Sequence, residues 1–249
     1  MKRVLTFALL AAALLGCGTS RAKKPSIDLP TRFPAAVVVE REITAPASGQ
    51  PLRTPTAMAT DFRGDTYLCD QGNDRIVKYN SALQPIVDRG GFGSQPGLFN
   101  DPRAITVDNQ LNVWVCDGGN RRLVRLDSDL NYVDEIRFTS TDDPMMFGVP
   151  SGIAATSYGS LWVCDLERDR VAIFDNVGQF EKFVGDFGAG GGPVRDPEGA
   201  AAQDDDRFYI CDAGNRRVMV YDSYGTDIMS LSDDQMRYPV AVALDRRQT

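Results

Sequence analysis

Short apolar runs, separated by turns rich in Gly, Asn and Asp, make up most of the chain. Runs such as Tyr67-Leu68-Cys69 and Leu161-Trp162-Val163-Cys164 are apolar at consecutive positions. They are too short for helices and are rich in aromatic and β-branched residues, which favours strands. Strands that are apolar on both faces belong to sheets covered on both sides. The pattern therefore predicts an all-β protein in which each sheet packs between other sheets.

The pattern recurs as a sequence repeat. Four stretches of 26 residues align without a gap, starting at Pro55, Pro102, Pro150 and Pro197, and their starts are 47, 48 and 47 residues apart. A unit of this length has room for four short antiparallel strands, which is the size of a β-propeller blade. We therefore predict a β-propeller domain over residues 31–249 that contains four complete four-stranded blades.

Two further pieces predict part of a fifth blade. Residues 35–43 stand where an outer strand would precede the first unit, and Pro239 begins a fifth inner strand only 42 residues after Pro197. Neither piece supplies the two middle strands of such a blade. Either the chain is truncated by about 20 residues relative to a full repeat, or the ring is open. An open ring would need its edge covered and would favour self-association.

A short motif within each unit resembles a known family. A strand ends in a small residue and Asp, then come Gly-Asn-x-Arg and a second strand that ends in an aromatic or apolar residue followed by Asp or Asn. This combination, over residues 50–245, resembles the NHL-repeat β-propeller family, which implies the same fold. The third unit departs from the motif, because Glu167 and Arg168 replace Gly and Asn.

Each motif places an aspartate five residues before an arginine. We expect the carboxylate to accept hydrogen bonds from turn amides and the arginine to close over it bidentately. A catalytic centre needs one constellation, whereas this one occurs four times, so we interpret it as a structural element of every blade. The pairs are Asp70 with Arg75, Asp117 with Arg122, Asp165 with Arg170, and Asp212 with Arg217.

Two other positions recur and are expected to fill the core. A cysteine precedes each motif aspartate, and stacked sheets lie about 10 Å apart, beyond the ~7 Å limit between Cα atoms for a disulfide. We therefore predict free, buried thiols beside the aromatic residue two positions earlier. An apolar residue three positions before each unit start should pack between blades. The cysteines are Cys69, Cys116, Cys164 and Cys211, and the apolar residues are Leu52, Phe99, Phe147, Val194 and Met236.

The N-terminus predicts export. Lys2 and Arg3 precede an apolar run over residues 4–15, which is too short to span a bilayer and indicates a signal peptide over residues 1–16. Leu14-Leu15-Gly16-Cys17 resembles the lipobox of bacterial lipoproteins, which implies lipidation of Cys17 and anchoring of the exported protein to a membrane of the cell envelope. Residues 17–30 then form a flexible tether. An ordinary signal peptide cut after an alanine at 11–13 is the alternative.

Composition narrows the function. The chain has 27 basic and 34 acidic residues, a net charge of -7 and no histidine. The negative charge argues against nucleic-acid binding, and the missing histidines remove the commonest general base and transition-metal ligand. We predict no cofactor.

Crossovers between blades vary in sequence, and loops on a rigid scaffold are where binding usually resides. The leading hypothesis is a non-enzymatic module that binds an envelope protein or glycan through these loops. The alternative, implied by resemblance to sugar lactonases and propeller lyases, is an enzyme with a metal held by carboxylates in the central channel. Candidate metal ligands would be Glu198, Asp101 and Asp196. Candidate binding residues are Phe92, Asp142, Asp143, Met145, Met146, Phe187 and Arg195.

Overall fold

The computed structural model describes residues 43, 48–137, 147–186, 192–203 and 207–244. Within these residues, sixteen strands form four separate antiparallel sheets, and each sheet contains four strands that are consecutive in the chain. Blade 1 contains β1 (Pro55–Thr60), β2 (Thr66–Asp70), β3 (Arg75–Tyr79) and β4 (Pro85–Gly90); blade 2 contains β5 (Pro102–Val107), β6 (Val113–Asp117), β7 (Arg122–Leu126) and β8 (Tyr132–Arg137).

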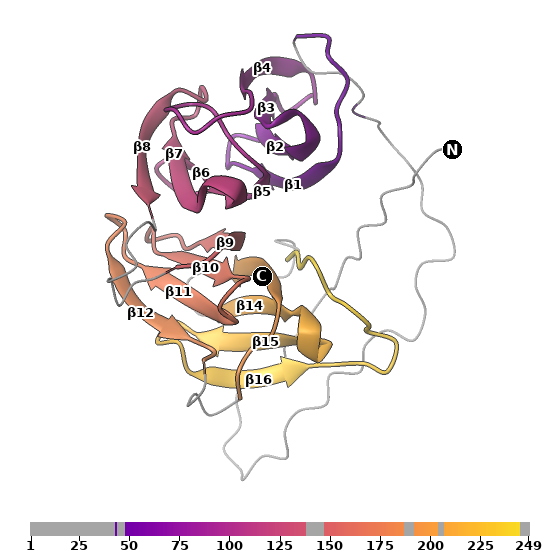
Figure 1. The fold of residues 1–249 in the computed structure, drawn as a ribbon, viewed down its shortest axis with the longest axis vertical. Helices are drawn as coiled ribbons and strands as arrows, with labels where there is room; N and C mark the ends of the chain where they lie inside the picture. The colour runs from indigo at the N-terminus through magenta and orange to yellow at the C-terminus, as the bar shows by residue number, and fades with distance from the viewer. Residues whose placement is uncertain (1–42, 44–47, 138–146, 187–191, 204–206, 245–249) are drawn as a thin grey trace.

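Blade 3 contains β9 (Pro150–Ala155), β10 (Leu161–Asp165), β11 (Arg170–Phe174) and β12 (Phe180–Val184); blade 4 contains β13 (Pro197–Gln203), β14 (Arg207–Asp212), β15 (Arg217–Asp222) and β16 (Asp227–Leu231). The blades follow one another in an arc from the indigo first blade to the yellow fourth blade (Figure 1), and their inner strands β1, β5, β9 and β13 are successive neighbours. The prediction of an all-β propeller with four complete blades is confirmed. In the described part of the chain, no helix is long and apolar enough to cross a bilayer.

Apolar side chains fill the space between successive blades. Trp162 of blade 3 stacks on Phe208 of blade 4 with ring centroids 3.8 Å apart, and Cys164 lies in the same cluster. The strands β2, β6 and β10 are buried along their whole length, as their apolar sequences predict. Phe99, Phe147 and Val194 are buried between blades, as expected. The stability of the fold therefore resides mainly in these interblade layers.

Turns on the face opposite the crossovers share one construction. Asp61 Oδ1 accepts the backbone N–H groups of Arg63 and Asp65 at 2.9 and 3.0 Å, and Asp222 Oδ1 does the same for the amides two and four residues later. Such a turn satisfies its backbone donors locally and leaves the tip residues in solvent. Phe62 and Tyr224 at these tips are 66% and 78% exposed.

The fifth unit forms no strand in the described residues, which corrects the prediction of a fifth inner strand from residue 239. An inner strand needs the second strand of its own blade to complete its hydrogen bonds, and the described chain supplies none. Residues 239–244 nevertheless lie beside β13. A Cβ added to Gly199 would overlap Val240 O, just as one added to Gly152 would overlap Glu198 O. The segment therefore occupies the place of the next inner strand without its pairing.

The two ends of the arc are covered differently from its interior. Val242 and Leu244 pack on the outer face of blade 4. Residues 35–42 of the expected N-terminal outer strand lie outside the described residues, whereas Ile43 packs on the outer face of blade 1 beside Leu52. Met58 of β1 is 49% exposed, but Ile105, its counterpart in β5, is 6% exposed because blade 1 covers it. No described blade covers the corresponding side of blade 1.

Candidate functional site

The crossovers lie over the turns that join the second and third strands. Gly72 N donates to Arg53 O at 2.8 Å, and Gly214 N donates to Arg195 O at 2.9 Å. Both residues belong to 3-10 turns, η1 (Gln71–Asn73) and η3 (Ala213–Asn215); blade 2 has the equivalent turn η2 (Gly118–Asn120). Crossovers and these turns therefore form one face of the molecule, which we call the crossover face.

The motif aspartates hold the crossovers. Asp70 Oδ1 accepts Arg53 N at 2.6 Å, and Asp117 Oδ1 accepts Asn100 N at 2.7 Å. The side-chain amide of Asn73 donates to Asp70 Oδ2 at 2.7 Å. We expected backbone amides of the turn to donate to these carboxylates. In these blades the donors are instead a crossover amide and an asparagine side chain, because the crossover packs directly over the turn. The carboxylate thus connects two chain segments.

The motif arginine of blade 1 spreads its donors instead of closing bidentately on the aspartate. Arg75 Nε lies 2.8 Å from Asp70 Oδ2, while its Nη1 lies 2.9 Å from Asp88 Oδ2 on the outer strand and its Nη2 donates to Gln50 O at 2.7 Å. The expected bidentate geometry is therefore wrong in blade 1, because the planar guanidinium faces three different elements. One buried side chain ties the second strand, the outer strand and the crossover together.

Blade 3 completes the motif only in part. Arg168 replaces the asparagine, Arg170 Nε lies 3.4 Å from Asp165 Oδ2, and Gly148 N donates to that same oxygen at 3.0 Å. The other oxygen, Asp165 Oδ1, is buried and has no hydrogen-bond partner among the described residues. Burial raises the pKa of the Asp165 carboxyl. The departure of this unit from the repeat therefore leaves an under-paired carboxylate.

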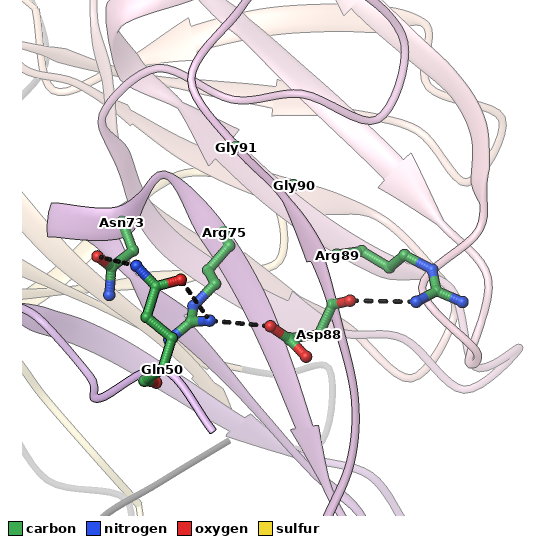
Figure 2. Close-up of a pocket in the computed structure, with 7 residues that line it drawn as sticks. All are labelled: Gln50, Asn73, Arg75, Asp88, Arg89, Gly90 and Gly91. Carbon is green, nitrogen blue, oxygen red and sulfur yellow. Dashed lines mark hydrogen bonds and ion pairs between the residues drawn. The ribbon is translucent and has the colours of Figure 1, made fainter. Parts of the chain in front are cut away.

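A small pocket of about 150 Å³ opens on the crossover face of blade 1 (Figure 2). Its polar side chains are connected, since Gln50 Nε2 donates to Asn73 Oδ1 at 3.3 Å and Arg75 Nη1 donates to Gln50 Oε1 at 3.3 Å. Arg89, on the other side in Figure 2, donates to the backbone oxygen of Asp88 at 3.1 Å. The lining residues are Gln50, Asn73, Arg75, Asp88, Arg89, Gly90 and Gly91.

Gly90 is a pocket-lining residue whose position differs between blades 1 and 2. It pairs with Arg75 at the end of β4, and Arg137 holds the same place in blade 2, where it pairs with Arg122. The Arg137 side chain forms an ion pair with Glu135 there. Gly90 has φ 126°, and an added Cβ would lie 2.7 Å from Asp74 O and 2.8 Å from Arg75 Cα. Only glycine fits this position, because a Cβ would overlap the backbone of Asp74 and Arg75.

Phe92 follows the pocket-lining Gly91 in the crossover and is 76% exposed. Its backbone is held in place, because Phe99 N donates to Gly91 O and Gly93 N donates to Phe99 O, each at 2.9 Å. Phe99 itself is completely buried. Among the predicted binding residues, Phe92 is therefore an exposed ring on a fixed backbone.

The other predicted site residues divide into two groups. Arg195 is exposed on the crossover face, and its backbone amide donates to Asp212 Oδ1 at 2.7 Å. The remaining candidates lie outside the described residues. They are Cys17, Asp142, Asp143, Met145, Met146 and Phe187.

The proposed channel carboxylates lie near the entry of the inner strands. Asp101 Oδ2 is 2.6 Å from Arg103 Nε, and Asp196 N donates to Asp169 Oδ1 at 2.8 Å. Burial raises the pKa of Glu198, the nearby charge of Arg103 lowers it, and Asp196 raises it again. Over the described ranges, no three His, Cys, Asp or Glu side chains converge into a group that could hold a metal ion.

The repeated cysteines are free and buried. Cys69, Cys116 and Cys164 lie between blades, whereas Cys211 lies on the outer face of blade 4 beneath the C-terminal segment. Burial raises the pKa of Cys211 to about 12 and also raises the pKa of Cys69, Cys116 and Cys164 above the ordinary thiol range. Each cysteine belongs to the same apolar cluster as the aromatic residue two positions earlier. They therefore act as core side chains, as predicted.

The four stacked blades define the chain as a β-propeller protein. No protein-family model and no curated protein sequence matches it. It is similar to the structure of a streptogramin B lyase, with 14% identity, a TM-score of 0.63 and coverage of 83% of this chain and 63% of that chain. It is also similar to the selenomethionine form of virginiamycin B lyase from Staphylococcus aureus, with 15% identity, a TM-score of 0.59 and coverage of 79% and 61%.

The structure of U3-55K is similar as well, with 11% identity, a TM-score of 0.58 and coverage of 77% of this chain and 57% of that chain. The chain thus spans about three-fifths of the length of these structures. At such identities the similarity shows the fold alone. The NHL-repeat assignment stays a prediction.

Proposed function

We propose that this protein is a lipid-anchored propeller of the cell envelope that binds a protein or glycan through its crossover face, without catalysis. One observation carries the proposal: the same buried Asp–Arg pairing fixes crossovers whose sequences differ from blade to blade. A rigid frame that presents variable loops is the usual design of a binding module. The absence of histidine from the sequence agrees with a non-catalytic role.

The anchor follows from the N-terminal sequence. Cys17 carries the lipid and residues 17–30 span the distance from the membrane to the propeller. Metabolic labelling with an alkyne-tagged palmitate tests this in full-length protein expressed in a Gram-negative host. We expect label and membrane association in the wild type and neither in Cys17→Ala. A labelled Cys17→Ala protein, or an unlabelled wild type, would contradict the anchor.

Photo-crosslinking tests the binding face. The photoreactive residue p-benzoylphenylalanine replaces Phe92 on the crossover face, or Phe62 on the opposite face as a matched control, since these phenylalanines are 76% and 66% exposed. We expect envelope protein or glycan to be captured from position 92 and not from position 62. Capture from position 62 alone, or from neither, would contradict binding through the crossover face.

A further inference from the structure

We propose that the pocket of blade 1 binds one sugar ring of an envelope glycan and that Phe92 provides an apolar surface at its rim. This inference rests on the proposed function and specifies the ligand class on the same face. It combines three observations: a pocket that offers donors and acceptors together, a pocket size suited to one ring, and an exposed aromatic side chain next to it in the chain.

The pocket matches hydroxyl groups in its chemistry. A hydroxyl both donates and accepts, whereas a carboxylate only accepts and a guanidinium only donates. Asp88 is 2.9 Å from Arg75, and Arg89 lies against the backbone of Asp88. Asp88 offers a sugar hydroxyl an acceptor, and Arg89 offers donors on the other side of β4 in Figure 2. The side-chain amides of Gln50 and Asn73 offer both functions.

The charges of the pocket favour a neutral ligand over a phosphate. Arg75 contacts two carboxylates, Asp70 at 2.8 Å and Asp88 at 2.9 Å. Counted with Arg89, the group holds two positive and two negative charges. A phosphate would meet Asp88 and receive no net attraction at short range. A pyranose ring needs hydrogen bonds without charge.

The size of the pocket sets the extent of the ligand. Its volume of about 150 Å³ is roughly half of the lower limit of ~300 Å³ for sites that enclose drug-sized ligands. It therefore takes a single ring, and the rest of a glycan chain would continue across the crossover face.

Phe92 supplies the apolar contact surface that the polar lining of the pocket lacks. A pyranose ring has a face made mostly of C–H groups, and an exposed aromatic ring packs on such a face while the hydroxyls reach polar groups at its edge. The backbone on both sides of Phe92 is fixed through Phe99, and the pocket side chains are already ordered by one another. Binding then costs little additional conformational entropy.

Blade 2 provides an internal comparison. Arg137 occupies the position of Gly90 there. Glu135 is the blade 2 counterpart of Asp88, and it forms ion pairs with Arg137 and Arg122. Arg137 and Arg89 are both exposed arginines at the end of an outer strand. The variant Arg137→Ala is therefore a suitable control for Arg89→Ala.

The test uses full-length protein in detergent on an array of oligosaccharides with terminal hexoses, N-acetylhexosamines, uronic acids and phosphosugars. The best binder is then titrated by calorimetry. We expect a terminal neutral pyranose to bind, with Phe92→Ala and Arg89→Ala each weakening affinity about tenfold, which is the effect of one lost aromatic contact or charged hydrogen bond. Phe62→Ala and Arg137→Ala should stay within about twofold of the wild type, and all four variants should keep the wild-type melting temperature.

Several results would overturn the inference. They are binding to no neutral sugar at millimolar concentration, binding only to phosphosugars, and neutral-sugar binding that Phe92→Ala and Arg89→Ala leave unchanged. If the array is negative while photo-crosslinking from position 92 captures a protein, the sugar site is wrong and the binding module stands. If position 92 captures nothing and the array is also negative, both proposals fail.

Discussion

Arg122 Nε lies 2.7 Å from Asp117 Oδ2, and neither side chain is exposed to solvent. The same guanidinium contacts Glu135 at 2.6 Å and donates to Leu98 O at 2.6 Å. Three chain segments therefore depend on one buried cation, and its removal would leave Asp117 charged and uncompensated. Such a loss is more costly than the net value of the pair itself.

We expect Arg122→Ala to lower the free energy of unfolding by about 3–5 kcal/mol. Arg170→Ala should cost less, because Arg170 lies 3.4 Å from its aspartate and is 16% exposed. Urea denaturation followed by tryptophan fluorescence measures both. Equal losses in the two variants would show that burial and distance do not govern the strength of these pairs.

The two ends of the arc predict a second difference in stability. Ile105 is 6% exposed and Met58, its counterpart, is 49% exposed. We expect Ile105→Ala to cost about 2–5 kcal/mol, as for other buried large-to-small changes, and Met58→Ala less than about 1 kcal/mol. A Met58→Ala loss as large as that of Ile105→Ala, measured in the same urea experiment, would indicate that another surface covers β1 in solution.

The repeat made most of the fold predictable. Unit length set the number of strands per blade, and the doubly apolar second strands indicated stacking between blades. The geometry around Asp70 and Arg75 was harder to predict from the sequence. Their pairing followed from spacing, but the crossover amide that Asp70 accepts depends on a segment 17 residues earlier in the chain, and such contacts carry no local signal.

The pocket shows why sites are harder to predict than folds. Phe92 was accessible to sequence analysis because it lies in a crossover, where binding residues are expected. Gly90 and Asp88 were not, since they form a pocket only after β4 pairs with β3 and brings Asp88 to Arg75. Comparison of Gly90 with Arg137 would have been the available signal, because a glycine replaces a long side chain at one repeat position.

The buried thiols predict resistance to alkylation. A thiol reacts as its thiolate, and burial raises the pKa of all four propeller cysteines. We expect no modification by iodoacetamide at pH 8 in the native state and four modifications, at Cys69, Cys116, Cys164 and Cys211, in 6 M guanidinium chloride, counted by peptide mass spectrometry after non-reducing digestion. Native-state labelling of one cysteine would identify a blade that opens locally.

Asp165 predicts a specific pH dependence. Burial raises its pKa, so the folded state holds this proton more tightly than the unfolded state, where the pKa is about 3.9. Between these two pKa values the folded state binds more protons, and the contribution of Asp165 to the free energy of unfolding falls as pH rises. The ionised form is the costly one because the carboxyl group is buried; in addition, Asp165 Oδ1 has no hydrogen-bond partner in the described structure.

Asp165→Asn removes this titration. We expect the wild type to gain stability relative to Asp165→Asn as the pH falls from 7 to 4, and the variant to be tolerated at pH 7.

Asp70→Asn should be destabilising at pH 7, since Asp70 accepts three hydrogen bonds of 2.6–2.8 Å from Arg53, Asn73 and Arg75. Urea denaturation at each pH measures both differences. Asp175→Asn, in a turn whose equivalent in blade 1 already uses Asn80, controls for the lost charge. A difference between wild type and Asp165→Asn that does not change with pH would mean that Asp165 has the same proton affinity folded and unfolded, and therefore that a further donor reaches Oδ1 in solution.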